Sequence, residues 1–201
     1  MKVMIDLFAG LGGASQAFWD HPDWLVLRID NNEDLLPHTK GLIMADITDF
    51  DAVCAIIDAL MPEEVEQLVI WASPPCLEFS NAFSSPRSKA QRAGLDYSPS
   101  MDCLFSALDL IEHYSPDIFW IENVRGATKY FEEEIGTFRQ RIGQFFLWGQ
   151  FPLIALREAR HRYLTKPDKR HSPLRANIRA EIPEEISQAV LASIEAQSKL
   201  F

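Results

Sequence analysis

Short apolar runs alternate with stretches of helical periodicity along most of this chain. The strand-like runs cover residues 2–8, 25–29, 42–45, 68–72, 118–121 and 145–148. The helical stretches cover 14–19, 51–60, 101–113, 128–142 and 182–198, whereas 80–100, rich in Ser, Arg and Pro, is predicted to be an exposed loop. Strands alternating with helices predict βαβ units, and so an α/β fold with a doubly wound, mostly parallel sheet and helices on both faces.

Polar or glycine-rich residues follow each of the first five apolar runs. They are 10–13, Asp30, Asp46, 73–76 and 122–123. Because ligands of such sheets bind at the carboxyl ends of the strands, we expect all five segments to line one crevice.

The composition is that of a single globular domain. The chain has 201 residues, is 47% hydrophobic and carries a net charge of −10, which argues against binding nucleic acid through bulk charge. No apolar run approaches the ~20 residues of a membrane span, and no charged region precedes a long apolar stretch at the N-terminus. Three cysteines without paired spacing favour a reducing cytoplasm over a disulfide framework or a metal site.

Basic residues gather in one segment of this acidic chain. Residues 151–180 contain eight Lys and Arg but only two Asp and Glu. Such a segment is either a solvated loop or a surface that tracks phosphates, and the composition alone leaves both interpretations open.

The first crevice segments favour an adenosine pocket. Glycines at 10–13 allow a ligand to approach the backbone closely, Asp30 can accept hydrogen bonds from ribose hydroxyls, and Asp46 can meet an adenine amino group. Each feature alone also fits a tight turn or a helix cap.

A cysteine and a glutamate provide candidate reactive groups. Pro74 and Pro75 stiffen the exit from the fourth apolar run and hold Cys76 in a polar loop, whereas we interpret Cys54 and Cys103 as structural thiols on apolar helix faces. Glu122, at the end of an apolar run, is partly desolvated, which suits it to donate a proton; capping of the next helix is the alternative.

Together these motifs resemble the cytosine-C5 DNA methyltransferase family. The resemblance rests on Asp-Leu-Phe-Ala-Gly-Leu-Gly-Gly at 6–13, on Pro-Pro-Cys with Phe-Ser at 74–80, and on Glu-Asn-Val at 122–124, in this order. It implies S-adenosylmethionine as methyl donor and a DNA cytosine rotated out of the helix as substrate. It further implies addition of the Cys76 thiolate to C6 of the base, with Glu122 acting at N3 and Asn123 in support.

The resemblance also implies a donor site. Its residues are Phe8, Gly10, Leu11, Gly12, Gly13, Asp30, Asn31, Asp46, Ile47, Ser73 and Pro75.

Several positions depart from the family pattern. Leu77 follows the cysteine where glutamine is usual. Arg160 and Arg162 keep the spacing of a family arginine pair and are carried over as catalytic candidates, although the preceding glutamine is missing. The asparagine usual before the closing Val-Pro is also missing before Ile182.

Family members insert a target-recognition region where this chain has only a short basic segment. We therefore expect a catalytic domain from 1–149 and 181–201, with 150–180 in place of that region. We expect the recognised DNA sequence to be short or loosely specified, or to be selected by a separate specificity protein, since base readout needs several positioned side chains. Such a compact enzyme suits a restriction-modification system or a phage, and hence the cytoplasm of a bacterial or phage-infected host cell.

Two further functions stay open at this point. The chain could be a catalytically weak or silent binding module that retains the methyltransferase fold. It could also keep the chemistry and act on RNA or cytosine nucleotides, which the missing recognition region permits.

Overall fold

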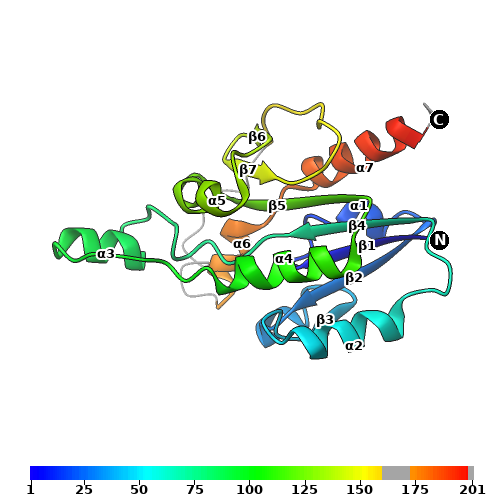
Figure 1. The fold of residues 1–201 in the computed structure, drawn as a ribbon, viewed down its shortest axis with the longest axis horizontal. Helices are drawn as coiled ribbons and strands as arrows, with labels where there is room; N and C mark the ends of the chain where they lie inside the picture. The colour runs from blue at the N-terminus through cyan, green and yellow to red at the C-terminus, as the bar shows by residue number, and fades with distance from the viewer. Residues whose placement is uncertain (160–172, 199–201) are drawn as a thin grey trace.

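One mixed sheet organises the molecule. The computed structural model describes residues 1–159 and 173–198. Its strand order is β3-β2-β1-β4-β5-β7-β6 (Figure 1). The strands are β1 (Lys2–Leu7), β2 (Trp24–Asp30), β3 (Leu42–Met44), β4 (Gln67–Ala72), β5 (Ile118–Val124), β6 (Gln140–Ile142) and β7 (Phe145–Trp148).

The first five strands in this order are parallel, and β7 is antiparallel to both β5 and β6. The chain builds the sheet outward from β1, first through β2 to β3 and then through β4 to β5. The strand order therefore changes direction between β1 and β4, and the carboxyl ends of these two strands flank that point. In open α/β sheets this point is the usual ligand crevice. The predicted doubly wound, mostly parallel α/β fold is therefore confirmed.

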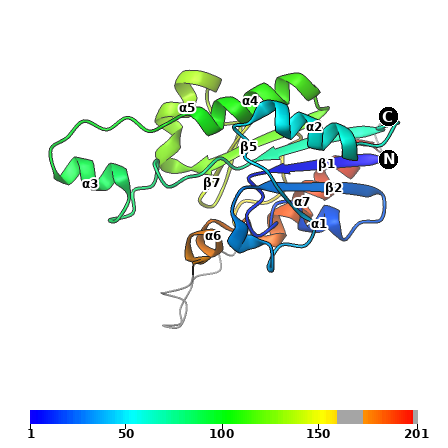
Figure 2. The same cartoon turned by 90° about the horizontal axis from the view of Figure 1, so that it is seen from below.

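Helices cover both faces of the sheet (Figure 2). One face carries α2 (Phe50–Leu60), α4 (Asp102–Tyr114) and α5 (Thr128–Ile135), which share one hydrophobic core with it. The other face carries α1 (Gln16–Trp19) and α7 (Glu184–Ser198) around a second core. The remaining helices are η1 (Glu33–Leu35), η2 (Arg125–Ala127), α3 (Pro86–Arg92) and α6 (Arg175–Ala180).

The alternation of side chains along a strand explains these two cores. In β1, Val3, Ile5 and Leu7 belong to the α2–α4 core, whereas Met4 belongs to the α1–α7 core. Because successive strand residues point to opposite faces, a strand buried on both sides is a continuous apolar run. This explains why the short apolar runs located the strands.

The predicted helix over 128–142 is wrong in its second half. The helix ends at Ile135, because Gly136 adopts a positive φ of 76° that ends helical geometry. Residues Gln140–Ile142 instead pair with β7 as an edge strand. Cross-strand pairing between these short segments outweighs the helical spacing of their apolar residues.

The predicted loop over 80–100 contains a helix. Ser85 caps α3 by accepting a hydrogen bond from the N–H of Ser88, and Pro86 occupies its first turn. Residues 80–100, hereafter the arm, project beyond the carboxyl edge of the sheet in Figures 1 and 2. Helix α6 was also missed, since residues 175–180 lack a clear apolar face.

No helix among the described ranges 1–159 and 173–198 is both long and apolar enough to cross a membrane.

Candidate active site

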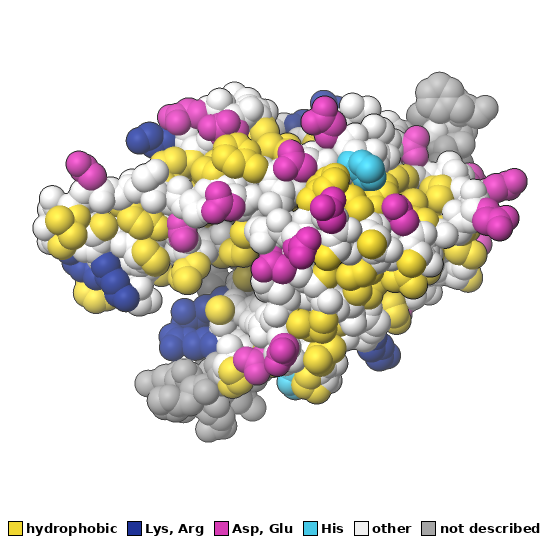
Figure 3. All heavy atoms as spheres, turned by 60° about the horizontal axis from the view of Figure 1, so that its bottom comes forward, with side chains coloured by type: hydrophobic (Ala, Val, Ile, Leu, Met, Phe, Trp, Pro, Cys, Tyr) yellow, Lys and Arg dark blue, Asp and Glu magenta, His cyan; other side chains and the backbone are white. Residues whose placement is uncertain are grey.

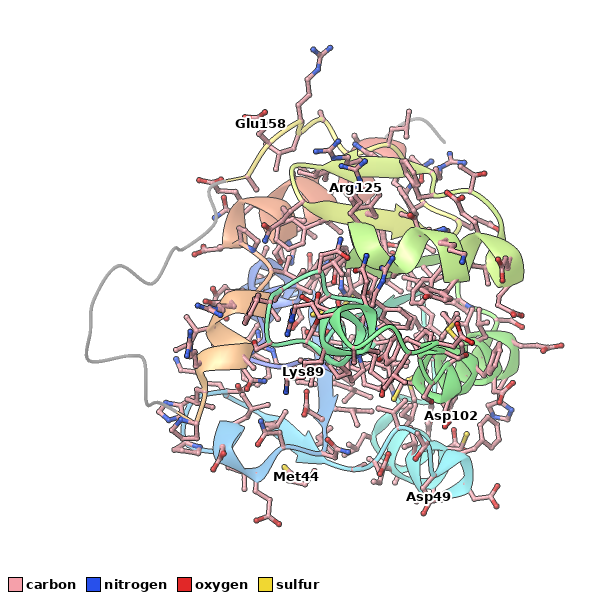
Figure 4. All side chains as sticks on the ribbon, turned by 90° about the vertical axis from the view of Figure 1, so that its left-hand side faces the viewer. Met44, Asp49, Lys89, Asp102, Arg125 and Glu158 are labelled. Atoms are coloured by element: carbon pink, nitrogen blue, oxygen red, sulfur yellow. The ribbon has the colours of Figure 1, made fainter. Side chains whose placement is uncertain are left out.

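The carboxyl ends of β1 to β5 bring the predicted segments to one edge, as expected from parallel pairing. Figure 4 looks at this edge, with Met44 at the end of β3 low in the picture and Arg125 after β5 high in it. Lys89 of the arm lies between them in this view. The site is therefore built at the ends of adjacent strands, with the arm projecting from the same edge.

The glycine turn after β1 is fixed by its neighbours. The N–H of Gly10 donates to Asp30 Oδ2 (2.9 Å), and Thr39 Oγ1 donates to the Gly10 carbonyl (2.8 Å). Gly10 has a φ of +54°, and a Cβ there would meet no atom within 4 Å. A positive φ beside open space allows close approach of a ligand to the backbone. Phe8, just before the turn, also has a positive φ (60°) and is half-buried.

Asp30 ends β2 and connects this turn to the next loop. Its Oδ1 accepts from the N–H of Asn32 (3.0 Å). Asn32 Nδ2 in turn donates to Asn177 Oδ1 of α6 (3.3 Å). Helix α6 is therefore hydrogen-bonded to the loop that follows the predicted ribose-binding carboxylate.

A buried arginine lies directly beneath the glycine turn. Arg28 is 1% exposed, and its guanidinium donates to the Gly12 carbonyl (3.3 Å) and to Ser15 Oγ (2.8 Å). A Cβ on Gly12 would lie 2.8 Å from Arg28 Cζ. The Ser15 hydroxyl donates to Asp6 (2.5 Å). Burial raises the pKa of Asp6 to about 7, although the hydrogen bond from Ser15 and the positive charge of Arg28 both act to lower it. This network holds the turn from below.

The closing segment of the chain returns to the same turn. Gly13 packs so tightly on the backbone of Ile182 that an added Cβ would collide with the Ile182 carbonyl. Ser187 of α7 donates to the Ala14 carbonyl (2.7 Å) and accepts from the N–H of Ala17 (3.0 Å). The structure thus places the backbone of Ile182 and the start of α7 against the glycine turn.

The loop after β3 combines an exposed carboxylate with a buried apolar side chain. Asp46 is exposed, and hydrogen bonds from the backbone and hydroxyl of Thr48, with a smaller one from Asn31, lower its pKa. Ile47 is 2% exposed and belongs to the core. Asp46 is therefore a turn residue, whereas the helix cap of α2 is Asp49, which accepts from the N–H of Ala52 (3.2 Å).

The Pro-Pro-Cys loop is tied to the neighbouring strand. Asn123 Nδ2 donates to the Pro74 carbonyl (2.9 Å), and Asn123 Oδ1 accepts from the N–H of Val124 (2.9 Å). Asn123 is 1% exposed. Strand β5 continues to Val124, so Glu122 and Asn123 lie inside the paired strand rather than after it, opposite Leu147 and Phe146 of β7. This pairing fixes the direction of both side chains.

Glu122 is a buried acid. It is 7% exposed, and burial raises its pKa to about 7, against the opposing effect of a hydrogen bond with Ser73. Ser73 Oγ also accepts from Trp71 Nε1 (2.8 Å), which orients the hydroxyl. Near neutral pH a large share of Glu122 is therefore protonated and able to donate.

Cys76 lies beside this acid and is half-buried. Burial, together with the negative charge of Glu122, raises the pKa of the Cys76 thiol to about 11. The N–H of Phe79 donates to the Cys76 carbonyl (3.1 Å), and Phe79 is buried against Phe131. The thiol is thus accessible and held next to a proton donor, but it carries its own proton in the free protein.

The structure agrees with some of the remaining predictions for arginines and cysteines and differs from others. Arg160 and Arg162 lie outside the described residues. Cys54 is buried in the core, as expected for a structural thiol. Cys103 is only half-buried, with burial and the charges of Asp46 and of carboxylates nearby raising its pKa, so the interpretation of a hidden core thiol is wrong.

Sequence reasoning missed Arg28, Ser15, Thr39 and Asn177. A charged residue inside the apolar run of β2 was the available signal for Arg28, because an arginine is almost never fully buried without partners. The others are ordinary polar residues whose role depends on distant partners.

One protein-family model matches most of this chain. The family model of the C-5 cytosine-specific DNA methylases matches residues 2–145. No curated protein matches the chain.

Two solved structures are similar to part of this chain. The Entamoeba histolytica methyltransferase EhMeth is 15% identical with a TM-score of 0.49, covering 80% of this chain and 57% of that one. An E. coli prophage protein assigned as a DNA modification methyltransferase is 18% identical with a TM-score of 0.45, covering 75% of this chain and 47% of that one. The chain thus spans about half the length of the solved structures it matches.

The sheet order and the strand-end site define a methyltransferase-type α/β domain. The chain belongs to the C-5 cytosine-specific DNA methylase family, whose model covers well over half of it. The resemblance carried by the three motifs is therefore confirmed.

Proposed function

We propose that this protein transfers a methyl group from S-adenosylmethionine to C5 of cytosine in DNA, through a covalent adduct between Cys76 and C6 of the base. The observation that carries the proposal is the pairing of an accessible thiol with a buried, proton-bearing carboxyl group, Glu122. Asn123 supports this pairing, since its bond to Pro74 ties the cysteine loop to the strand that carries the acid.

The residues at the turn after β1 fit the donor. An adenosyl amino acid needs a carboxylate for the ribose hydroxyls and an approach to bare backbone, and Asp30 and Gly10 supply these. We propose that 10–13 surround its amino-acid part, with Phe8, Asn31, Asp46 and Ile47 around the adenosine and with Ser73 and Pro75 near the sulfonium. S-adenosylmethionine supplies an electrophilic methyl group when bound there.

The chain's own residues activate the base. C5 of cytosine is a weak nucleophile, and addition of sulfur at C6 makes it enamine-like. As the Sγ–C6 bond forms, the thiol proton passes to solvent and Glu122 gives its proton to N3. After C5 has gained the methyl group, its hydrogen leaves as a proton to water, and the Sγ–C6 bond breaks. The departing thiolate then takes up a proton from solvent, and N3 returns its proton to Glu122. The net products are 5-methylcytosine, the demethylated donor and one proton.

We propose that the DNA sequence recognised by this protein is short or loosely specified. We propose 1–149 and 181–201 as the catalytic domain, with 150–180 as a basic segment in place of a recognition domain. Phe151 and Ile154 pack in the core on the α7 face, so the start of this segment is anchored to the catalytic domain. Strong sequence readout would then require a separate specificity protein.

Trapping on DNA that contains 5-fluorocytosine tests the proposal. Fluorine cannot leave C5 as a proton does, so the adduct persists after methyl transfer and migrates with the protein on a denaturing gel. We expect an adduct with the wild-type protein that requires the donor, and none with Cys76→Ser. Cys103→Ser is the matched control, since it removes another half-buried thiol and should leave trapping intact.

Nucleoside analysis completes this test. After incubation with tritiated donor and unmodified DNA, label is expected in 5-methylcytosine. If the folded wild-type protein neither forms the adduct nor methylates DNA, it would instead be a silent binding module. Label that reaches only RNA or free nucleotides would reassign the acceptor.

A further inference from the structure

A buried arginine joins three segments near the edge of the sheet. Arg28 lies inside β2 and is 1% exposed. Its guanidinium donates to Ser15 Oγ (2.8 Å) and Gln16 Oε1 (3.2 Å), where α1 begins. It also donates to the Gly12 carbonyl (3.3 Å) in the glycine turn and to the Lys40 carbonyl (3.1 Å) before β3. Because the planar guanidinium has five N–H donors in fixed directions, one side chain can hold the turn, the helix and the loop together.

The contacts around Arg28 compensate the burial of its charge. Asp6 is its neighbour in the register of β1 and β2, and the Ser15 hydroxyl connects the two side chains, since it donates to Asp6 and accepts from Arg28. The Trp19 ring of α1 lies 4.6 Å from the guanidinium carbon, and Gly41 packs on that ring so closely that a Cβ would collide with it. The loop before β3 is therefore packed against the same helix that Arg28 contacts.

Charge balance alone does not explain why this position carries an arginine. Apolar side chains of similar volume often replace a buried ion pair without loss of stability. A methionine at position 28 would fill much of the same space, but it could not bond to a carbonyl. Two of the acceptors of Arg28 are the Gly12 and Lys40 carbonyls, which lie in the segments that connect β1 to α1 and β2 to β3. This pattern indicates a geometric role, in which the arginine fixes two backbone segments relative to each other.

Holding the Gly12 carbonyl fixes the peptide group that links Gly12 to Gly13. The C=O and N–H of a trans peptide point in opposite directions, so the Gly13 N–H points away from the guanidinium. Backbone N–H groups in a glycine turn can bind an anionic group of a ligand. Arg28 therefore sets the direction of an N–H group that the turn can offer to the carboxylate of an amino acid.

The glycine turn also has an open side. A Cβ on Gly10 would meet no atom of the described ranges within 4 Å. Figure 3 shows a notch between the arm and the rest of the molecule, on the side where the strands end. Arg28 thus supports the turn from its buried side and leaves the open side to a ligand.

We propose that Arg28 is a positioning residue of the donor site, which sets the glycine turn in the shape that receives the amino-acid part of the donor. This inference rests on the proposed function, since it takes S-adenosylmethionine as the ligand of the turn. Arg28 belongs to none of the three motifs that carry the family resemblance. It acts through the Gly12 and Lys40 carbonyls and makes no contact with the donor itself.

Calorimetry with the full chain tests this role through two ligands. S-adenosylhomocysteine carries the amino-acid part, whereas 5′-methylthioadenosine has the same nucleoside and sulfur without it. Arg28→Lys keeps a positive charge beside Asp6, but a single ammonium group cannot reproduce the planar fork that reaches both carbonyls. We expect it to weaken S-adenosylhomocysteine binding about 10-fold or more, the effect of one lost hydrogen bond to a charged group, and methylthioadenosine binding less than about 3-fold.

A labelled-methyl transfer assay adds a readout that a loss of folded protein would not produce. With DNA in excess, Arg28→Lys should raise the KM for the donor about 10-fold and leave kcat within about 2-fold of the wild type, since loss of uniform binding raises KM alone. A smaller fraction of folded protein would instead lower kcat and leave KM unchanged.

Matched variants separate this role from general effects. Arg141→Lys changes an exposed arginine on the edge strand β6 that likewise donates to a glycine carbonyl (Gly143, 2.6 Å), and it should leave both affinities unchanged. If Arg28→Lys does not fold, the double change Asp6→Asn with Arg28→Met takes its place, because it removes both buried charges with little change in volume. The double variant should show the same selective loss of S-adenosylhomocysteine binding.

Each result decides the inference. Wild-type affinity for S-adenosylhomocysteine in Arg28→Lys overturns the positioning role, and equal weakening of both ligands overturns it in favour of a role in fold stability alone. Absence of S-adenosylhomocysteine binding by the wild type overturns the inference together with the donor site. Selective loss in Arg28→Lys, alongside wild-type protein that binds this ligand but neither traps nor methylates, would uphold the inference and refute only the catalytic proposal.

Discussion

Glu122→Gln should stabilise the fold at high pH and change little at low pH. The pKa of Glu122 is about 7 in the folded protein and 4.5 for an unperturbed glutamate. A carboxyl whose folded pKa is raised favours folding only while protonated. Its contribution is therefore fully present below pH 4.5 and is lost as the pH rises through 7. Glutamine is isosteric, can still accept from Ser73 and carries no charge at any pH.

The magnitude follows from the two pKa values. Each unit of difference corresponds to about 1.4 kcal/mol, so ionised Glu122 costs about 3 kcal/mol once the pH exceeds 8. At pH 5 the same linkage costs below about 1 kcal/mol. The advantage of Glu122→Gln should thus grow by about 2–3 kcal/mol between pH 5 and pH 8, or roughly 4–12 °C in melting temperature for a chain of this size.

Urea unfolding monitored by tryptophan fluorescence measures this difference. Wild type and variant are compared at pH 5 and pH 8, so that the ionisation of Asp6, common to both proteins, cancels. Glu132→Gln on α5 is the control, because that residue is exposed and should show no such dependence. An equal free-energy difference at the two pH values would show that Glu122 ionises normally, and the proton-donor role would lose its basis.

Three further perturbations probe the site. Asn123→Ala removes the hydrogen bond to Pro74 and leaves a buried carbonyl unpaired, which should lower the free energy of unfolding in urea by about 1–3 kcal/mol. Adduct formation should slow, while the affinity for S-adenosylhomocysteine in calorimetry stays near wild type. Unchanged trapping would contradict the anchoring of the cysteine loop by Asn123. Gly13→Ala forces a methyl group onto the Ile182 carbonyl and should lower both the melting temperature and that affinity, and a wild-type melting curve would refute the close packing. The trapping rate of the wild type should rise up to about pH 7 and then level, because loss of the Glu122 proton offsets the growing share of Cys76 thiolate. The trapping rate of Glu122→Gln should keep rising above pH 7. Parallel pH profiles of the two proteins would count against Glu122 as the acid.

The sequence located the strands well because of where they lie. A strand covered on both faces must be apolar throughout, so β4 and β7 were visible as uninterrupted runs. The reactive residues were equally visible, since glycines at 10–13 and the Pro-Pro-Cys segment are unusual after such runs. Parallel pairing then placed them at one edge without further information.

Two short elements were harder to predict, because the spacing of their apolar residues does not mark them. Residues 140–142 become a strand only through pairing with β7, and α3 depends on the cap at Ser85 within a segment that has no apolar periodicity. Local spacing cannot reveal either feature, because the deciding contact is a cross-strand pair or a single hydroxyl.

The sequence by itself determined which chemical groups this protein has and at which end of the sheet they lie. Only the tertiary structure decided their state: burial in β5 raises the pKa of Glu122, the Asn123 amide holds the cysteine loop beside it, and Arg28 supports the glycine turn from below. The reason is physical, since residue type and strand order are local or topological properties. Desolvation and hydrogen bonding depend on every atom that packs around a group.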